Sequence, residues 1–307
     1  MNTETVTFGF IGFGEASYHI AGGLLEEGAK AVRAYDVQAR NHPRSEMIQK
    51  RAGELGVALD PSVEELIRNS DVIVSATSAK VALAVAQDAA RHLTKEKLYV
   101  DINAASPDVK RQIAQTLGDL PFVDVAVVES VPAYRHRVPM LISGSGASRF
   151  ADIARRYRMQ ATLVGDEPGS ASAIKMARSI FLKGLTMLLL ETLSLSRHFG
   201  VEEEILRSIE QSITRKPLKE RANDLISRSA IHAERRVAEM EEVLHTLRAA
   251  ELDGTMSEAT RNKLQMLVDL ELNRYFNYEA PDGYAEVIDA ILERGRERGE
   301  AKAAEKQ

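Results

Sequence analysis

A short run of small residues near the N-terminus has the composition of a phosphate-binding loop. The segment GFGEAS follows an apolar stretch and has the pattern GxGxx with a small residue in the last place. The first glycine of this pattern allows a tight turn, the second lets the backbone approach a pyrophosphate, and the last small residue lets a helix pack against a strand. The following helix would turn unpaired N–H groups and its positive dipole end toward the phosphates. The loop therefore predicts a dinucleotide site made by Gly12, Phe13, Gly14, Glu15, Ala16 and Ser17.

Polar residues after the next apolar runs extend this site. Asp36 would accept hydrogen bonds from the adenosine ribose and repel a 2′-phosphate, so its position favours NAD over NADP as the cofactor. Arg40 and Arg44 lie just beyond it and would hold a phosphate if the loop folded back, which keeps NADP open. Thr77 and Ser78 follow a third apolar run, where the nicotinamide-side loop usually lies. Their hydroxyls are expected either to contact ribose or phosphate or to cap the next helix.

The elements that must position these residues alternate through the first half of the chain. Short apolar runs separated by helical patterns indicate crossover units, and hence a largely parallel sheet that helices cover on both faces. The expected strands are residues 6–11, 32–35, 71–76, 98–102, 123–127, 140–143 and 162–164.

The pattern changes near residue 168. Residues 170–199 contain no proline and one glycine, which predicts a helix of about 45 Å that is apolar over much of its surface and therefore buried at the centre of the protein. Helical patterns continue from there to the C-terminus. We therefore predict an α/β fold: a Rossmann-type doubly wound sheet domain over residues 1–167 that binds NAD(P), followed by an all-helical substrate and dimerisation domain over residues 168–307.

The composition argues against several classes of function. The chain has 307 residues and a net charge of -5, which disfavours a nucleic-acid partner. It has no cysteine, and its seven histidines form no HExxH or HxxH pair, so no metal ligand is nominated. The N-terminus lacks the features of a secretory signal, and the apolar stretch 180–195 is interrupted by Lys183 and Glu191. We expect a cytoplasmic protein with no membrane partner.

Four motifs in the chain resemble those of one enzyme family. Residues 9–17, GFIGFGEAS, are similar to the opening signature of the β-hydroxyacid dehydrogenases, and residues 101–107, DINAASP, to their DxSTxSP segment. Residues 124–130 with 144–146 resemble the DAPVSGG…GG stretch, and residues 169–179 the GxGxxxKxxNN helix. Because the motifs occur in family order, the chain is identified as a divergent member of the β-hydroxyacid dehydrogenase and 6-phosphogluconate dehydrogenase-like family, which includes 3-hydroxyisobutyrate dehydrogenase.

The resemblance implies an activity, a set of site residues and an assembly. It implies NAD(P)-linked oxidation of a small, anionic hydroxy acid, or the reverse reduction of its keto or semialdehyde form. Lys175 matches the family's catalytic lysine and would act as general acid/base at the substrate oxygen, with Arg178 as a neighbouring cation. The helical domains of this family commonly build a dimer, so a homodimer is expected. The substrate-binding positions implied by the motifs are Asn103, Ala104, Glu129, Ser130, Arg178 and Ser179, and Asn103 is also expected at the cofactor.

Several of these positions depart from the family pattern. Asn103 stands in place of a serine, and Glu129-Ser130 stand in place of Gly-Gly, where the glutamate would obstruct a carboxylate, pair with Arg178, or recognise a hydroxyl or amine. Arg178-Ser179 replace the usual Asn-Asn, and Leu182 replaces the acid of the decarboxylating branch, which argues against decarboxylation.

Two other interpretations and two other features stay open. An imine reductase of similar fold is an alternative that Lys175 disfavours, and a non-catalytic dinucleotide-binding sensor is another.

The basic segment 134–137 would either attract an anionic substrate or form a solvated loop. Glu191, inside the long apolar helix, is expected to be buried with a partner, in either a structural or a functional role.

Overall fold

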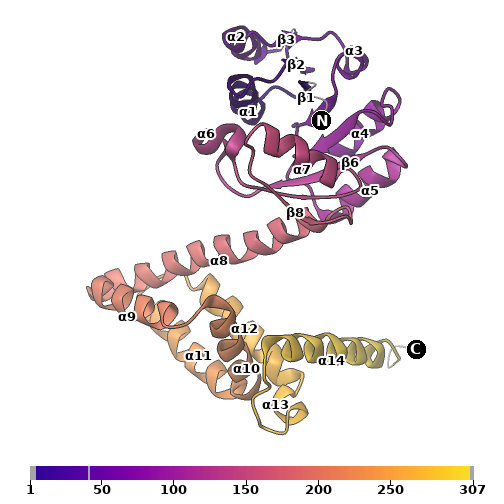
Figure 1. The fold of residues 1–307 in the computed structure, drawn as a ribbon. Coiled ribbons are helices and arrows are strands. Elements are labelled where there is room, and N and C mark those ends of the chain that lie inside the picture. The colour runs from indigo at the N-terminus through magenta and orange to yellow at the C-terminus, as the bar shows by residue number, and fades with distance from the viewer. Residues whose placement is uncertain (1–4, 41, 305–307) are drawn as a thin grey trace. The chain divides into compact units, whose positions relative to one another are not determined.

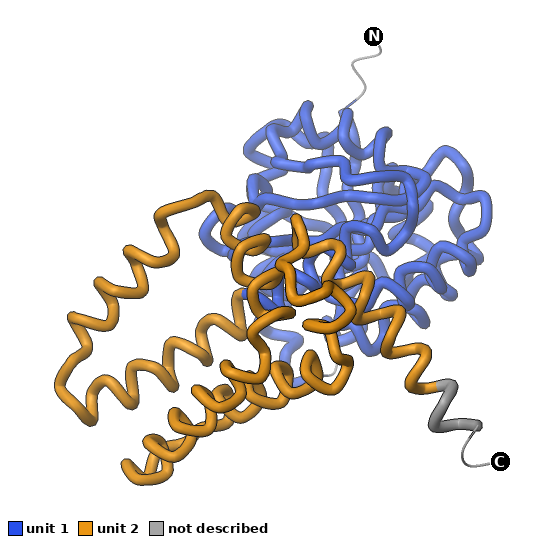
Figure 2. The backbone as a smooth tube through the Cα atoms, turned by 90° about the horizontal axis from the view of Figure 1, so that it is seen from below, with its two compact units in different colours: residues 1–181 blue, residues 182–307 orange. Residues whose placement is uncertain are grey.

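The computed structural model describes residues 5–40 and 42–304 and has two compact units that divide at Phe181/Leu182 (Figures 1 and 2). The division falls inside the long helix α8, Ser170–Phe199, rather than at its start. The first part of α8 belongs to the sheet-containing unit because its first turn packs there. The boundary that we predict at 167/168 lies just before this helix, and as a division of function it stays a prediction.

The N-terminal unit is built on an eight-stranded sheet with the order β3-β2-β1-β4-β5-β6-β7-β8. Neighbouring strands are parallel except β6 and β7, which run antiparallel. The predicted α/β class is confirmed, and each predicted strand is present; the two-residue β3 was missed because so short a segment has no readable periodicity. The strands are β1 Thr7–Ile11, β2 Ala31–Tyr35, β3 Ala58–Leu59, β4 Val72–Ser75, β5 Leu98–Asp101, β6 Phe122–Val127, β7 Met140–Ser143 and β8 Ala161–Gly165.

Helices cover both faces of this sheet, and each face has its own apolar core. Alternate strand residues point to opposite faces, so Phe8 and Val100 enter one core while Ile73 and Tyr99 enter the other. The first core is closed by α1 Glu15–Glu26, α2 Ser45–Leu55 and α7 Ala147–Arg156, and the second by α3 Val63–Arg68, α4 Ala82–Ala90 and α5 Pro107–Leu117. The short helix α6, Val131–Tyr134, and a 3-10 turn, Arg135–Arg137, follow β6.

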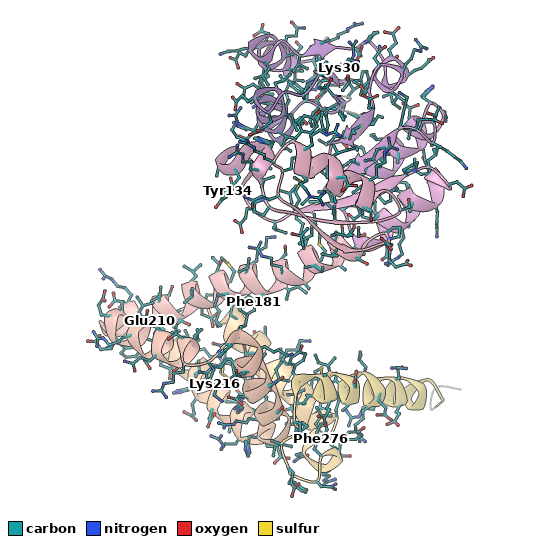
Figure 3. The ribbon with its side chains drawn as sticks, in the orientation of Figure 1. Lys30, Tyr134, Phe181, Glu210, Lys216 and Phe276 are labelled. Carbon is teal, nitrogen blue, oxygen red and sulfur yellow. The ribbon has the colours of Figure 1, made fainter. Side chains whose placement is uncertain are left out.

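The helix α8 has the predicted bounds but not the predicted burial. Its first turn is buried at Ala171 and Ser172, yet Ile180 is 79% and Leu190 60% exposed, and Phe181 also stands out from the ribbon (Figure 3). An 18-residue window of α8 has a mean hydropathy of 1.3, and only 11% of that window is buried. By length and composition alone, α8 would be able to cross a membrane. The expectation of a buried central helix is thus wrong for the single chain, because a helix of this length extends past the sheet that covers its start.

The C-terminal unit is helical throughout, as predicted. It has a small core of Ala230, Leu270, Leu272, Val287 and Ala290. Its further helices are α9 Glu202–Thr214, α10 Leu218–Ile231, α11 Ala233–Ala249, α12 Thr255–Asp269, α13 Leu272–Tyr275 and α14 Tyr284–Ala304.

The buried Glu191 has a structural role in this unit. Its carboxylate accepts hydrogen bonds from the N–H of Met256 at 2.7 Å and from the N–H and hydroxyl of Ser257 at 2.9 and 2.6 Å. These groups belong to the first turn of α12, where backbone N–H groups have no partner within the helix. Glu191 therefore caps α12 and ties it to α8. Of the two predicted roles for this residue, these contacts support the structural one.

Candidate active site

The loop between β1 and α1 has a conformation that only glycine takes easily at its first position. Gly12 has φ of +90°, and a Cβ atom there would lie 2.5 Å from the carbonyl oxygen of Ala76. Its N–H donates to the carbonyl of Tyr35 at 2.8 Å, which ties the loop to the end of β2. The turn after β1 is therefore packed directly against the end of β4, and any side chain at residue 12 would push the two apart.

The second glycine leaves open space instead. Gly14 is the residue before α1, no side chain caps that helix, and a Cβ atom at Gly14 would meet no protein atom within 4 Å. Ser17 is buried, and its hydroxyl donates to the carbonyl of Gly12 at 2.7 Å, so a serine fits this position and braces the loop. The start of α1 thus presents uncapped N–H groups beside an open space, which is the arrangement that binds a phosphate.

The other predicted loop residues differ in what they offer. The ring of Phe13 is fully buried, and its N–H donates to Oδ2 of Asp36 at 2.8 Å, so Phe13 shapes the loop from within. Glu15 and Ala16 lie in the first turn of α1, where Glu15 is exposed. Oδ1 of Asp36 accepts the N–H of Gln38, also at 2.8 Å. Two backbone N–H groups therefore hold the Asp36 carboxylate in a fixed orientation.

A cavity of about 600 Å³ opens next to this loop. Asp36 and Arg44 both line it, and Arg40 lines a smaller adjoining hollow of about 270 Å³ that also contains Asp36. The larger cavity is lined by Ile11, Gly12, Gly14, Tyr35, Asp36, Val37, Gln38, Arg44, Met47, Ile48, Val63, Ala76, Thr77, Ser78, Val81, Ala84, Val85 and Asp88. Its apolar walls suit a flat base, Asp36 suits a ribose, and the α1 start suits a diphosphate. The residues present therefore fit a dinucleotide.

Thr77 and Ser78 face this cavity rather than capping a helix. Both line the cavity, whereas α4 begins after Val81 without a side-chain cap. The N–H of Thr77 donates to Oδ1 of Asn103 at 2.6 Å. The hydroxyl of Thr77 also donates to the same oxygen at 3.4 Å. Contact of the Thr77 and Ser78 hydroxyls with a bound ribose or phosphate, the first of the two predicted roles, stays a prediction.

Asn103 is committed to the protein through its whole amide. Its Nδ2 donates to Oγ of Ser75 at 2.9 Å and to Oδ2 of Asp101 at 2.7 Å, while Oδ1 accepts from Thr77. The residue is 5% exposed, and Ala104 beside it is exposed. These bonds show that Asn103 holds the Thr77 loop in place. A direct contact between the Asn103 amide and a substrate stays a prediction.

The remaining predicted site residues gather around the start of α8. Arg178 donates to the carbonyl of Val128 at 2.7 Å and to the carboxylate of Glu129 at 2.8 Å, so Glu129 and Arg178 contact each other. Lys175 is half-buried one helical turn before Arg178; Ser179 is half-buried and Ser130 exposed. Of the described residues that line the 600 Å³ cavity, none comes from this group. The site thus has two parts in the N-terminal unit, a cofactor cavity and a cluster at α8.

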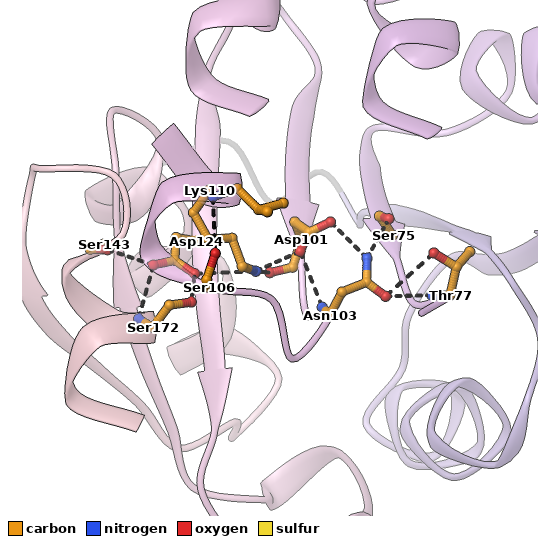
Figure 4. A network of polar contacts seen from close by, with 10 residues as sticks. Ser75, Thr77, Asp101, Asn103, Ser106, Lys110, Asp124, Ser143 and Ser172 are labelled. Carbon is orange, nitrogen blue, oxygen red and sulfur yellow. Dashed lines mark hydrogen bonds and ion pairs between the residues drawn. The ribbon is translucent and has the colours of Figure 1, made fainter. Parts of the chain in front are cut away.

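A buried ion-pair network near these two parts was not predicted. Lys110, Asp101 and Asp124 are all fully buried, and Nζ of Lys110 contacts both carboxylates (Figure 4). Two aspartates at buried strand positions were visible in the sequence as motif members. The lysine was missed because nothing in a single helical pattern shows which face of α5 meets the sheet.

The basic segment 134–137 is tied to α1 and is not a free anion-attracting loop. Arg135 pairs with Glu26 at 2.7 and 2.9 Å, and Arg137 pairs with Glu27. His136 between them is buried against α1, where a Cβ atom at Gly23 would lie 1.8 Å from its Nδ1. The segment therefore braces the helix that carries the phosphate loop, and the substrate-attracting alternative is not supported.

The burial of His136 predicts a pH dependence of stability. Burial, aided by Arg135 and Arg137 and opposed by Glu27, holds the pKa of His136 below its usual value of 6.5. The unfolded chain therefore takes up this proton first as the pH falls, so the stabilisation is complete above about pH 6.5 and is lost below it. We expect the free energy of unfolding to fall more between pH 7 and pH 5 in the native chain than in His136→Gln. The exposed residue His245 provides the control variant His245→Gln. An equal fall of the unfolding free energy in the native chain and in His136→Gln would contradict this role. So would a reduced fall in His245→Gln alone.

Comparisons with known proteins match two separate parts of the chain to two family descriptions. The family described as NADP oxidoreductase coenzyme F420-dependent matches residues 7–105, and a domain of unknown function, DUF1932, matches residues 197–267. The chain is 30% identical over 254 residues to the uncharacterized 28.5 kDa protein in 7S RNA 5'region of Methanothermus fervidus, and the match covers 83% of this chain and 96% of that protein.

Solved structures extend the likeness. The conserved hypothetical protein from Sinorhizobium meliloti 1021 is 34% identical with a TM-score of 0.61, covering 95% of this chain and 97% of that one. The conserved protein MTH1747, itself described as similar in structure to 3-hydroxyacid dehydrogenases, is 34% identical with a TM-score of 0.60 over 86% and 97%. An imine reductase variant from Myxococcus stipitatus in complex with NAD+ shares the fold, with a TM-score of 0.71 at 18% identity over 95% and 99%. The chain therefore belongs to the family that joins an NAD(P)-binding Rossmann domain to a DUF1932 domain and that resembles the 3-hydroxyacid dehydrogenases in structure.

Proposed function

We propose that this chain is an NAD(P)-dependent oxidoreductase that transfers a hydride between nicotinamide and a small hydroxy acid or its keto or semialdehyde form. The observation that carries the proposal is the cradle around the 600 Å³ cavity, formed by Gly12, Gly14, Asp36 and Thr77. A Cβ atom at Gly14 would clash with none of the described protein atoms, so packing within the protein does not explain why this residue is a glycine. Gly14 lies beside the uncapped start of α1. A ligand that approaches the backbone there explains this glycine.

Each part of the cradle has a role toward the dinucleotide. The start of α1 would hold the diphosphate, Asp36 the adenosine ribose, and the Thr77 and Ser78 hydroxyls the nicotinamide side. When bound, the nicotinamide supplies or accepts the hydride. Arg44 in the same cavity and Arg40 next to it would offset the charge of a 2′-phosphate, so NADP remains a candidate cofactor beside NAD.

Lys175 would move the proton that accompanies the hydride. Oxidation of a carbinol releases the hydroxyl proton, and a lysine amine placed at that oxygen is able to take it and to return it in the reverse direction. Lys175 lies three residues after Ser172, which Asp124 anchors to the sheet, so the lysine starts from a fixed part of α8. We further propose that the substrate is a small anion, which the cationic side chains of Lys175 and Arg178 near the start of α8 would attract.

A non-catalytic sensor of the dinucleotide is the second candidate. It is supported by two predicted substrate-binding side chains that already have partners within the protein. The Asn103 amide is fully hydrogen-bonded, and Arg178 is paired with Glu129. A sensor would keep the cradle and need no open substrate position. The two candidates therefore agree on cofactor binding and differ on turnover.

Initial rates separate these candidates. We would measure them on a panel of small 3-hydroxy acids and hydroxylated sugar acids, with NAD and with NADP as oxidant, and on cyclic imines with the reduced cofactors. Turnover of a hydroxy acid supports the proposed function. Turnover of imines alone would replace it by imine reduction, and dinucleotide binding without any turnover would replace it by the sensor.

The choice between NAD and NADP is expected to depend on Asp36. In Asp36→Asn, one amide oxygen still accepts a backbone N–H, but the charge that would repel a 2′-phosphate is gone. We expect the ratio of the Kd for NADP to the Kd for NAD to fall about tenfold. Fluorescence titration with NADH and NADPH measures this ratio, and Asp88→Asn, which changes another carboxylate of the cavity lining, is the matched control. An unchanged ratio would show that Asp36 does not face the ribose.

We also propose that the chain is a homodimer that covers the exposed apolar side chains of α8. Ile180, Leu190 and Phe199 are each more than half exposed in the single chain, and burial of such side chains against a second copy would be strongly favourable. Light scattering is expected to give twice the 33.8 kDa of the chain. Ile180→Glu/Leu190→Glu should lower this mass, whereas Leu292→Glu should not. A native mass of one chain, or sedimentation with lipid vesicles, would contradict the proposal.

A further inference from the structure

A row of buried polar side chains crosses the sheet of the N-terminal unit at one level. In register, Ser75 of β4 pairs with Asp101 of β5, Asp101 with Asp124 of β6, and Asp124 with Ser143 of β7. All four are fully buried. Register partners on neighbouring strands point to the same face of a sheet, so these side chains form a continuous line. We call these four residues the polar row.

Lys110 joins the two acids of the polar row. It comes from α5, the helix that connects β5 to β6, and it is fully buried. Its Nζ donates to the carbonyl of Asp101 at 2.8 Å, contacts the Asp101 carboxylate, and reaches Oδ1 of Asp124 at 3.2 Å (Figure 4). A buried charge is tolerated only when it is paired and hydrogen-bonded. Without the ammonium, two carboxylates would face each other out of contact with water.

One end of the polar row reaches the cofactor cavity. Asn103 donates to Ser75 and to Asp101, its N–H donates to Oδ1 of Asp101 at 3.1 Å, and it accepts the N–H of Thr77. Thr77 lines the cavity. The position of the Thr77 loop therefore depends on where Asp101 is held.

The other end of the polar row holds the start of α8. The N–H of Ala171 donates to Oγ of Ser143 at 3.1 Å, and Ser172 donates to Asp124 through its N–H at 3.0 Å and its hydroxyl at 2.7 Å. A carboxylate at this place also complements the positive end of the helix dipole. Lys175 follows Ser172 by three residues and so lies close to the same face of α8. The position of Lys175 therefore depends on where Asp124 is held.

We propose that Lys110 is a positioning residue that sets the Thr77 loop and the Lys175-bearing turn of α8 relative to each other. It does so by fixing the spacing between Asp101 and Asp124. Asp101 holds the Thr77 loop through Asn103, and Asp124 holds the start of α8. The inference rests on the proposed function, because the two parts that it aligns are the cofactor side and the proton-transfer side of the reaction. A purely structural lysine would stabilise the fold without linking these two ends.

The test is Lys110→Met in the full chain, read by hydrogen exchange and by kinetics. We expect backbone exchange to rise about tenfold or more both in peptides that contain Thr77 and in peptides that contain Ala171 and Ser172. We expect kcat to fall about 10- to 100-fold, because small misplacement of reacting groups has effects of that size, while the Kd for the dinucleotide weakens less than about fivefold. Should Lys110→Met fail to fold, Lys110→Gln, which keeps a donor but no charge, takes its place.

Lys97→Met is the matched control. Lys97 also uses Nζ to bond backbone carbonyls of the same unit, those of Ser70 at 2.6 Å and Arg68 at 3.3 Å, but it does not touch the polar row. It should change neither set of peptides nor kcat. Exchange that rises at only one end of the row, or kcat within about twofold of the native value, overturns the inference. Coupled exchange at both ends in a protein without turnover would support the link and overturn the proposed function instead.

Discussion

Lys175→Ala is expected to lower kcat for hydride transfer by about 10²- to 10⁴-fold while leaving the Kd for the dinucleotide within about twofold. The range is that of losing a positioned general acid or base. The cofactor affinity should persist because the cradle is built from Gly12, Gly14, Asp36 and Thr77, and no residue of 175–179 is among the described residues that line the cavity. Initial rates with the best substrate of the panel, together with dinucleotide titration, measure both quantities.

Lys183→Ala is the control for this loss. Lys183 lies on the same helix, eight residues further on, and is exposed. The substitution removes the same charge from α8 without touching the first turns, so kcat should stay within about twofold. Equal turnover in the native chain and in Lys175→Ala would remove Lys175 from the reaction. Loss of turnover in both lysine variants would point to a general effect of charge on α8.

Gly12→Ala is expected to weaken dinucleotide binding by about 10- to 100-fold, which corresponds to about 1.4–2.8 kcal/mol. The added methyl group would lie 2.5 Å from the carbonyl oxygen of Ala76, and φ of +90° is itself unfavourable for alanine. The loop must therefore move away from β4, and the start of α1 moves with it. Fluorescence titration with NADH or NADPH measures the change in Kd.

Gly28→Ala is the control that separates the backbone strain of alanine at positive φ from the clash with Ala76. Gly28 has a similar φ of +84°, but a Cβ atom there would meet nothing within 4 Å, and Gly28 does not line the cavity. It should lower the melting temperature without changing the Kd. A Gly12→Ala protein that binds the dinucleotide as tightly as the native chain would show that the cofactor does not use this loop.

Much of the fold could be predicted because local patterns decide it. The apolar runs of the first half and the proline-free run of α8 correspond closely to the observed elements, and the glycine loop lies between a strand and a helix as its spacing implied. What could not be predicted depends on contacts between elements. The antiparallel pairing of β6 with β7 has no signal in either strand alone. The exposure of α8 was misjudged because an apolar helix surface does not by itself show whether other elements of the same chain cover it.

The site residues also divide into those that local patterns place and those that contacts between elements place. Gly12 and Asp36 are close in sequence to the elements that place them, and the structure brings both to one cavity. The pairing of Glu129 with Arg178 was one of several predicted alternatives, and only the geometry of the segment after β6 against α8 could select it. The link from Asp101 through Lys110 to Asp124 depends on strand register and on the face that α5 turns to the sheet. Neither is encoded in a motif, so this network emerged only from the structure.

Dinucleotide binding by the cradle is tested most directly by isothermal titration of the native full-length chain with NADH and with NADPH. We predict saturable binding of one dinucleotide per chain, with a micromolar Kd for at least one of the two and a weaker Kd in Gly12→Ala. Absence of binding of either dinucleotide at millimolar concentration, by a chain shown to be folded, would contradict the proposed function and leave only the fold assignment.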